Sequence, residues 1–148
     1  MISAGIKGPF GWVSLVERDD CLVGLSWQAP EEPGESPLLT EGLRQLQAYF
    51  DKRLVRFDLP VAWGSGLNAA VRRAMADIPF GETRTYGQIA KAVGAAPQAV
   101  GQACGANPLP IIIPCHRVTG TDWFGGFSAP GGVETKAALL RHEGALLL

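Results

Sequence analysis

A cysteine and a histidine stand side by side at Cys115 and His116, directly after Pro114. Cysteine attacks as its thiolate, and an adjacent histidine can accept the thiol proton, so the pair is a candidate activated nucleophile. Glu143 lies on a helix expected near the C-terminus, and its carboxylate could complete a Cys–His–Glu relay. The pair alone is a weak signal, because small buried cysteines and core histidines are commoner than catalytic ones. The chain has only two histidines, and the rigid apolar setting of His116 favours the catalytic interpretation.

The other cysteines make no recognisable pattern with Cys115. Cys21, Cys104 and Cys115 are an odd number at wide spacings, which predicts neither a disulfide framework nor a C-x-x-C metal clip. The first residues lack the pattern of a secretory signal, and no apolar run approaches the ~20 residues that span a bilayer. We therefore expect a soluble cytoplasmic protein with no membrane segment, no metal and no cofactor.

Size and composition indicate a globular protein of one ordinary domain or two very small ones. The chain has 148 residues, of which 47% are hydrophobic and 18% charged. Its net charge of -1 is unevenly divided: residues 1–62 carry 6 Lys and Arg against 9 Asp and Glu, whereas residues 63–148 carry 7 against 5. The C-terminal part is therefore the better candidate to face a polyanion.

The first third of the chain reads as a small sheet with one helix. Residues 11–16 and 21–27 are rich in β-formers and flank a polar turn, which predicts a hairpin. Ser36 is followed by a proline and then by apolar residues at steps of three and four, which predicts an amphipathic helix over about 38–52. Residues 63–66 form the expected linker, so we predict domains at 1–62 and 63–148.

Three short helices are expected next, at about 67–78, 86–93 and 98–105, and Thr85 can cap the second. The last two have the outline of a helix-turn-helix. The third is dominated by Ala and Gly, which suits either close packing against another helix or entry of a smooth surface into a DNA minor groove.

The segment that contains the candidate nucleophile begins after a turn at Asn107. The run from Pro110 to Pro114 predicts a buried strand bounded by prolines. A glycine-rich loop over 120–132 and a final helix over about 133–143 follow.

The sequence from Asn107 to Val118 resembles the active-site signature of the O6-alkylguanine-DNA alkyltransferases, also called methylated-DNA–protein-cysteine methyltransferases. The resemblance covers about residues 59–148 well and the N-terminal third only loosely. Its further segments are Asp77 to Thr83, Thr85 to Ala90, Ala99 to Gly101, Gly131-Gly132, Lys136, and Leu139 to Gly144.

This resemblance implies direct repair of alkylated guanine by a protein that uses no cofactor. It implies an α/β (α+β) fold: a small ribonuclease-H-like N-terminal domain of sheet plus helix, followed by a helical, winged-helix-like alkyltransferase domain. The partner would be double-stranded DNA containing O6-alkylguanine, bound by a monomer. The damaged base would be swung out of the stack, because its O6 substituent is otherwise out of reach.

The resemblance also implies a role for individual residues. Cys115 would be the alkyl acceptor, His116 would draw off its proton through a water, and Glu143 would orient His116. Tyr86 would donate a proton to the departing guanine, and Asn107 would hold the turn before the active-site segment. The implied pocket residues are Pro110, Val118, Phe127 and Ser128, and the implied DNA contacts are Thr85, Gln88, Gln98, Ala99 and Gly101.

Three positions depart from the family pattern. Gln98 stands where the family usually has an arginine that enters the duplex, so we expect weaker DNA binding and less efficient base flipping. Phe127 stands where tyrosine is frequent, which bears on substrate size, and Arg72 replaces a usual tryptophan. The structural zinc of some relatives is not expected, because Cys21 is alone in the N-terminal part.

Other functions compete with alkyl transfer. A lesion-binding relative without transfer activity would lack the acceptor cysteine, so Cys115 counts against it, although Gln98 keeps it open. A winged-helix regulator with a merely buried Cys115 would need a sequence-specific operator. A cysteine hydrolase would need an oxyanion hole, which no sequence feature indicates.

Overall fold

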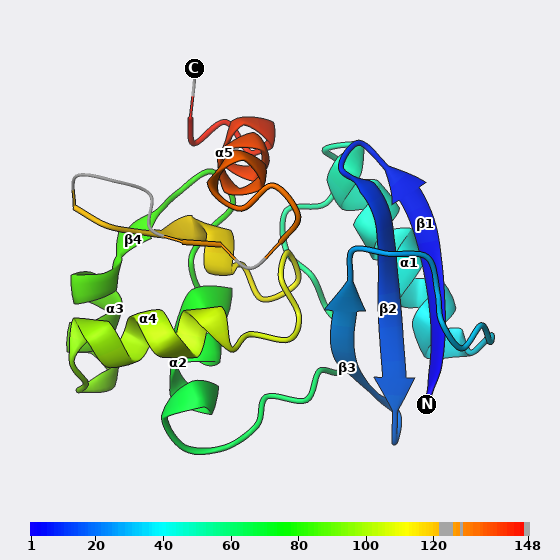
Figure 1. Cartoon of the computed structure of the whole chain (residues 1–148), viewed down its shortest axis with the longest axis horizontal. Coiled ribbons are helices and arrows are strands. Elements are labelled where there is room, and N and C mark those ends of the chain that lie inside the picture. The colour runs from blue at the N-terminus through cyan, green and yellow to red at the C-terminus, as the bar shows by residue number, and fades with distance from the viewer. Residues whose placement is uncertain (122–125, 128, 147–148) are drawn as a thin grey trace. The chain divides into compact units, whose positions relative to one another are not determined.

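The computed structural model describes residues 1–121, 126–127 and 129–146. Contacts divide the chain into two compact units, Met1–Ala62 and Trp63–Leu148. Together they give a mixed α/β structure with a small antiparallel sheet and helices α1 to α5 (Figure 1). Among the described residues, the helices are too short or too polar to traverse a lipid bilayer.

The first unit contains a three-stranded antiparallel sheet in the order β1-β2-β3, formed by Ile2–Gly8, Gly11–Arg18 and Cys21–Ser26 (Figure 1). The hairpin predicted from β2 and β3 is confirmed. Asp19 and Asp20 form its turn with φ of 52° and 63°, the left-handed conformation that suits a two-residue hairpin. Strand β1 was not predicted, although Ile2, Ala4 and Ile6 alternate with Ser3, Gly5 and Lys7, because its alanine and glycines have low strand propensity. It pairs with β2 along its whole length.

Helix α1, Pro37–Phe50, covers one face of this sheet, and the prediction of a helix over 38–52 is confirmed to within two residues. The Ser36 hydroxyl caps its first turn by accepting a hydrogen bond from the Leu39 amide at 3.0 Å. Gly42 lies so close to β2 that an added Cβ would be 2.6 Å from the Leu15 side chain. Fully buried side chains from helix and sheet form the core here: Leu15, Leu22, Leu39, Leu46 and Tyr49.

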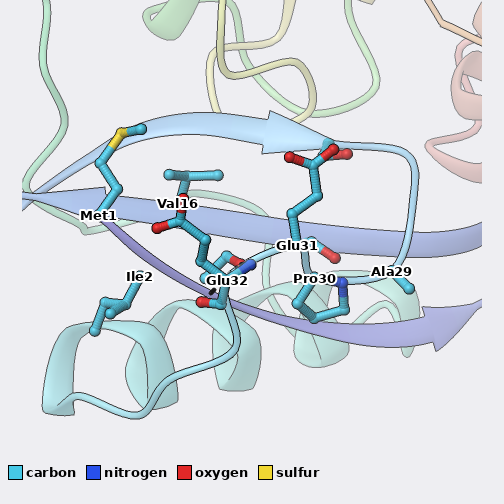
Figure 2. Close-up of a pocket in the computed structure, with 10 residues that line it drawn as sticks. Met1, Ile2, Val16, Ala29, Pro30, Glu31 and Glu32 are labelled. Carbon is cyan, nitrogen blue, oxygen red and sulfur yellow. Dashed lines mark hydrogen bonds between the residues drawn. The ribbon is translucent and has the colours of Figure 1, made fainter.

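A cavity of about 230 Å³ lies against this sheet, beneath the loop at residues 29–32 (Figure 2). Ser14 lines it and alternates along β2 with Leu15, so the cavity faces away from α1. The Ser14 hydroxyl donates to the Gln28 carbonyl, and Ser3 exchanges hydrogen bonds with the backbone of Glu32 at 2.9–3.3 Å. These serine hydroxyls serve to hold the loop.

The second unit begins with three short helices, α2 (Gly66–Ala76), α3 (Tyr86–Val93) and α4 (Pro97–Gly105), which confirm the three predicted ones. A capping box starts α3: Thr85 Oγ1 accepts from the Gln88 amide at 3.1 Å, and Gln88 Oε1 accepts from the Thr85 amide at 2.8 Å. The apolar faces of α2, α3 and α4 meet in a buried core that includes Val71, Met75, Ile89 and Val100.

The predicted strand from Pro110 to Pro114 is wrong, although the segment is buried as expected. The chain instead folds back in tight turns, with hydrogen bonds from the Ile112 amide to the Pro110 carbonyl and from the Ile113 amide to the Leu109 carbonyl. Ile111 takes a φ of 73°, which ends any extended run. Prolines have no amide hydrogen, so this segment is poorly suited to a strand ladder.

The remaining elements frame the turn that contains Cys115. Cys115–Arg117 form a single 3-10 turn (η1), followed by β5, Val118–Thr119, which pairs in parallel with β4, Arg84–Thr85. Helix α5 spans Val133–His142, and η1 contacts both α2 and α5. Arg72 is buried, and its guanidinium donates to the carbonyls of Trp63 and Ala106 at 3.0 and 3.3 Å.

Candidate active site

Cys115 is buried at the start of the 3-10 turn, and the turn before it is held by Asn107. The Asn107 side-chain amide donates to the Ile113 carbonyl at 2.8 Å, and its oxygen accepts from the Leu109 amide at 3.1 Å. The two hydrogen bonds close the bend between α4 and η1. Burial raises the pKa of Cys115, and the Asn107 amide and the charge of Lys136 act against that rise.

His116 is completely buried and hydrogen-bonded to Glu143, the residue that ends α5. Its Nε2 lies 2.6 Å from Glu143 Oε2, whereas Nδ1 has no hydrogen-bond partner among the described residues. Burial lowers the pKa of His116, and the partly opposing attraction of Glu143 does not reverse this. A neutral imidazole that donates from Nε2 to a carboxylate leaves Nδ1 as a proton acceptor.

Glu143 is an ionised carboxylate although it is buried. Burial alone would raise its pKa, but hydrogen bonds from His116 and Arg117 hold the pKa well below its usual value. Arg117 contributes two of these contacts, from Nε to Oε1 at 2.8 Å and from Nη2 to Oε2 at 3.0 Å. The result is a closed, hydrogen-bonded charge pair beneath the histidine.

Lys136 is a second buried cation, and it lies close enough to Cys115 to act on its titration. Its ammonium donates to the carbonyls of Val118 at 2.6 Å and Gly126 at 3.3 Å, and lies 5.7 Å from the centre of the Tyr86 ring. Burial lowers the pKa of Lys136 to about 8, against the attraction that Cys115 and Cys104 exert when they are ionised. A protonated Lys136 therefore favours the Cys115 thiolate.

The buried cluster of Arg117, Lys136 and Glu143 has a net positive charge when Cys115 and His116 are neutral. With a neutral thiol and a neutral imidazole, Arg117 and Lys136 carry two positive charges against the single negative charge of Glu143. Ionisation of Cys115 adds one negative charge near Lys136 and balances the charge of the cluster. A thiolate is therefore better tolerated here than burial alone would allow.

Cys115 opens into a cavity of about 180 Å³ within the second unit. Tyr86 from α3 and Phe127, which lies before α5, form the aromatic part of the cavity wall. Helix α4 contributes only small residues. The complete lining is Tyr86, Gly101, Cys104, Gly105, Cys115, Gly126 and Phe127. Burial raises the pKa of Cys104 to about 12, so this second thiol in the cavity is a poor nucleophile at neutral pH.

Of the other residues expected in the pocket and at the DNA, only Gly101 lines this cavity among those that the structure describes. Pro110 and Val118 are buried but do not line this cavity, and Ser128 lies outside the described residues. Thr85 and Gln88 bind each other in the capping box of α3. Gln98 is exposed in the first turn of α4, Ala99 next to it is half-buried, and Gly101 reaches the cavity wall.

Sequence reasoning missed the roles of Arg117 and Lys136 in this cluster. Lys136 did give a signal, because it lies on the same face of its helix as Leu139, Leu140 and Glu143, where a lysine has to be buried. Arg117 gave none, since its partners Ile78 and Glu143 are 39 and 26 residues away in the chain.

Comparisons with known proteins point to one family. Residues 67–145 match the family model described as the DNA-binding domain of 6-O-methylguanine DNA methyltransferase. The chain is 40% identical to the methylated-DNA–protein-cysteine methyltransferase of Mycolicibacterium paratuberculosis, covering 93% of this chain and 89% of the relative. It is 43% identical to the protein of the same name from Methanosarcina acetivorans, over 81% and 75% of the two chains.

A solved structure agrees with these relatives over nearly the whole chain. The structure of Mycobacterium tuberculosis OGT in complex with DNA superposes with a TM-score of 0.85 at 35% identity, covering 97% of this chain and 93% of that one. The match includes the segments that hold Cys115, His116 and Glu143 within residues 67–145. The chain therefore belongs to the methylated-DNA–protein-cysteine methyltransferase family.

Proposed function

We propose that this protein repairs DNA directly, by moving an alkyl group from O6 of guanine to the Sγ atom of its own Cys115. The observation that carries the proposal is the buried Cys115 at the wall of a cavity, next to a His116 whose Nε2 lies 2.6 Å from Glu143. The names of the relatives support the same reaction.

The proposed reaction is a displacement at the alkyl carbon. The Cys115 thiol loses its proton to His116, through a water, and Glu143 stabilises the resulting imidazolium. The thiolate then forms a sulfur–carbon bond while the bond between that carbon and O6 breaks. Tyr86, which lines the cavity, supplies a proton to the departing guanine and is reprotonated from the His116 imidazolium through water, so that the net result moves the thiol proton to guanine.

The product would be a thioether, which neither thiol–disulfide exchange nor thiol reduction reverses. Each molecule would therefore act once. Asn107 would keep Cys115 in place by closing the turn before it, as its hydrogen bonds to Ile113 and Leu109 suggest. The chemistry needs no metal or cofactor.

The proposed partner is double-stranded DNA that contains O6-alkylguanine, bound by a monomer in the cytoplasm. In this proposal the second domain, 63–148, is winged-helix-like, and the first, 1–62, is ribonuclease-H-like. The base would be flipped into the cavity beside Cys115. Exposed Gln98 at the start of α4 would approach the duplex together with Ala99, Gly101, Thr85 and Gln88. The expected pocket residues are Phe127, Ser128, Pro110 and Val118.

Intact-protein mass spectrometry tests this function directly. After incubation with excess duplex bearing one O6-methylguanine, the mass should rise by one CH₂ unit per chain and stop there. Peptide mapping should locate the gain on Cys115, and Cys115→Ala should show no gain while still binding DNA. Transfer retained by Cys115→Ala would move the acceptor elsewhere, with Cys104 the first residue to map.

A lesion-binding function without transfer is the second candidate, favoured by Gln98 in place of the usual arginine. The same experiment separates the two. Binding of the alkylated duplex with no change of mass would reject alkyl transfer and identify a lesion sensor.

A further inference from the structure

Arg117 joins three segments of the second unit through one guanidinium. Its Nε and Nη2 bind the two oxygens of Glu143 at 2.8 and 3.0 Å, and Nη1 donates to the Ile78 carbonyl, beyond the end of α2, at 2.7 Å. The guanidinium also lies 5.9 Å from the centre of the Phe80 ring. With 6% of its side chain exposed, Arg117 is in the interior and has a fixed orientation.

The contact with Glu143 is directly coupled to His116. Glu143 Oε2 lies 2.6 Å from His116 Nε2 and also accepts from Arg117 Nη2, so one oxygen serves both residues. A planar two-pronged donor fixes the plane of a carboxylate, which a single histidine contact would not do. The direction in which Glu143 meets the imidazole is therefore set by Arg117.

We propose that Arg117 is a positioning residue for the proton transfer from Cys115: it orients the Glu143 carboxylate toward His116 Nε2, so that His116 presents Nδ1 as the proton acceptor. The inference rests on the proposed function for its consequence in alkyl transfer. Its structural basis, the arrangement of Arg117, Glu143 and His116, stands independently of that function.

The charges around His116 decide the direction of the effect. Glu143 and Lys136 face it from α5, and Arg117 from its own turn; Glu143 favours the imidazolium, whereas the two cations oppose it. Burial lowers the pKa of His116, and the charge of Arg117 lowers it further. Removal of the Arg117 charge has two effects on His116. It removes a repulsion of the imidazolium, and it leaves the carboxylate of Glu143 with His116 in place of both residues. Both effects raise the pKa of His116.

The expected effect is a shift in the pH profile of alkyl transfer. The acid limb of the rate reports the base that must be neutral, His116. In Arg117→Met it should move to higher pH by about one unit, the usual scale for a nearby charge. Arg117→Lys keeps a cation but loses the two-pronged contact, so it should move the limb in the same direction by less. Arg44→Met, at an exposed ion pair of the first unit, is the matched control.

A direct titration of His116 makes the test independent of catalysis. The chain has two histidines, so NMR of labelled imidazoles in a His142→Gln background reports His116 alone. The midpoint for His116 should rise in Arg117→Met and, by less, in Arg117→Lys. If the unmodified protein transferred no alkyl group, the proposed function would fail, while this titration would still decide the role of Arg117.

A double-mutant cycle tests whether Arg117 acts through Glu143. Once Glu143→Gln has removed the carboxylate, adding Arg117→Met should shift the midpoint of His116 much less than it does in the parent. An equal shift in both backgrounds would mean that Arg117 acts on His116 by charge alone, and would overturn the positioning role.

The outcome that rejects the proposal is a lower rate with an unmoved limb and an unmoved His116 midpoint in both variants, as expected of a residue that only supports the fold. Should Arg117→Met not fold, Arg117→Lys decides by itself: a shifted midpoint supports the proposal, and an unshifted one overturns it.

Discussion

The side-chain amide of Asn107 donates a hydrogen bond to the carbonyl of Ile113, six residues later, at 2.8 Å. Its oxygen accepts from the Leu109 amide, so one buried side chain holds both sides of the turn that leads into Cys115. The backbone between these points has no regular ladder, and Ile111 within it takes a φ of 73°. The Asn107 side chain thus fixes the turn before the nucleophile together with the backbone hydrogen bonds within it.

We expect Asn107→Ala to destabilise the protein by about 1–3 kcal/mol, because it removes the acceptor of the buried Leu109 amide and one of the two hydrogen bonds to the Ile113 carbonyl. Alkyl transfer should fall as well, since the turn before Cys115 loosens. Urea unfolding and single-turnover rates measure both effects. Asn68→Ala, at an exposed position in the first turn of α2, is the matched control. Equal stability of the two variants would show that the turn holds without Asn107.

Lys136→Met should slow alkyl transfer at pH 7 by about tenfold or more, because an opposite charge close to a thiol typically lowers its pKa by 1–3 units. The unmodified protein should also lose rate as pH rises through about 8, where Lys136 gives up its proton. The variant should lack this decline. Lys7→Met, at an exposed strand position, serves as control. An unchanged rate at pH 7 would show that Lys136 does not promote the ionisation of Cys115.

The stability of the protein should depend on pH through Glu143. Its folded-state pKa lies below the ordinary value of 4.5, so its contribution is present above that pH and is lost as pH falls toward the folded pKa. Glu143→Gln should unfold more readily at pH 7, since it leaves Arg117 buried without a counter-charge, and should change less with pH below about 4.5. Urea unfolding between pH 3 and 7 makes the measurement. Parallel curves for the two proteins would mean that Glu143 is not held ionised.

Gln98→Arg should increase the affinity for duplex DNA and the rate of alkyl transfer, because it restores a charge and a planar donor at an exposed position of α4. The salt dependence of binding should steepen by about one unit in the log–log slope for one added phosphate contact. Gln47→Arg on α1 adds the same charge in the first unit and is the control. Unchanged affinity and rate would show that Gln98 does not limit DNA binding or alkyl transfer.

Much of the local structure could be predicted because short stretches of sequence encode it. Ser36 before a proline marks the start of α1, and Thr85 marks the start of α3. Strand β1 could not be found in this way, since its residues become a strand only by pairing with β2. The isoleucines before Pro114 were misread, because a buried apolar run looks the same whether the chain extends or turns.

The sequence by itself determined the identity of the candidate nucleophile and its neighbour, the helices with their caps, and the resemblance to one family. Only the tertiary structure decided which charges surround the pair. His116 meets Glu143 across 27 residues, Arg117 meets Ile78 across 39, and Lys136 meets Val118 across 18. No local propensity fixes such contacts, because they form only when α5 and the end of α2 pack against the turn at Cys115. The pKa values that govern the chemistry follow from that packing, through burial and the proximity of charge.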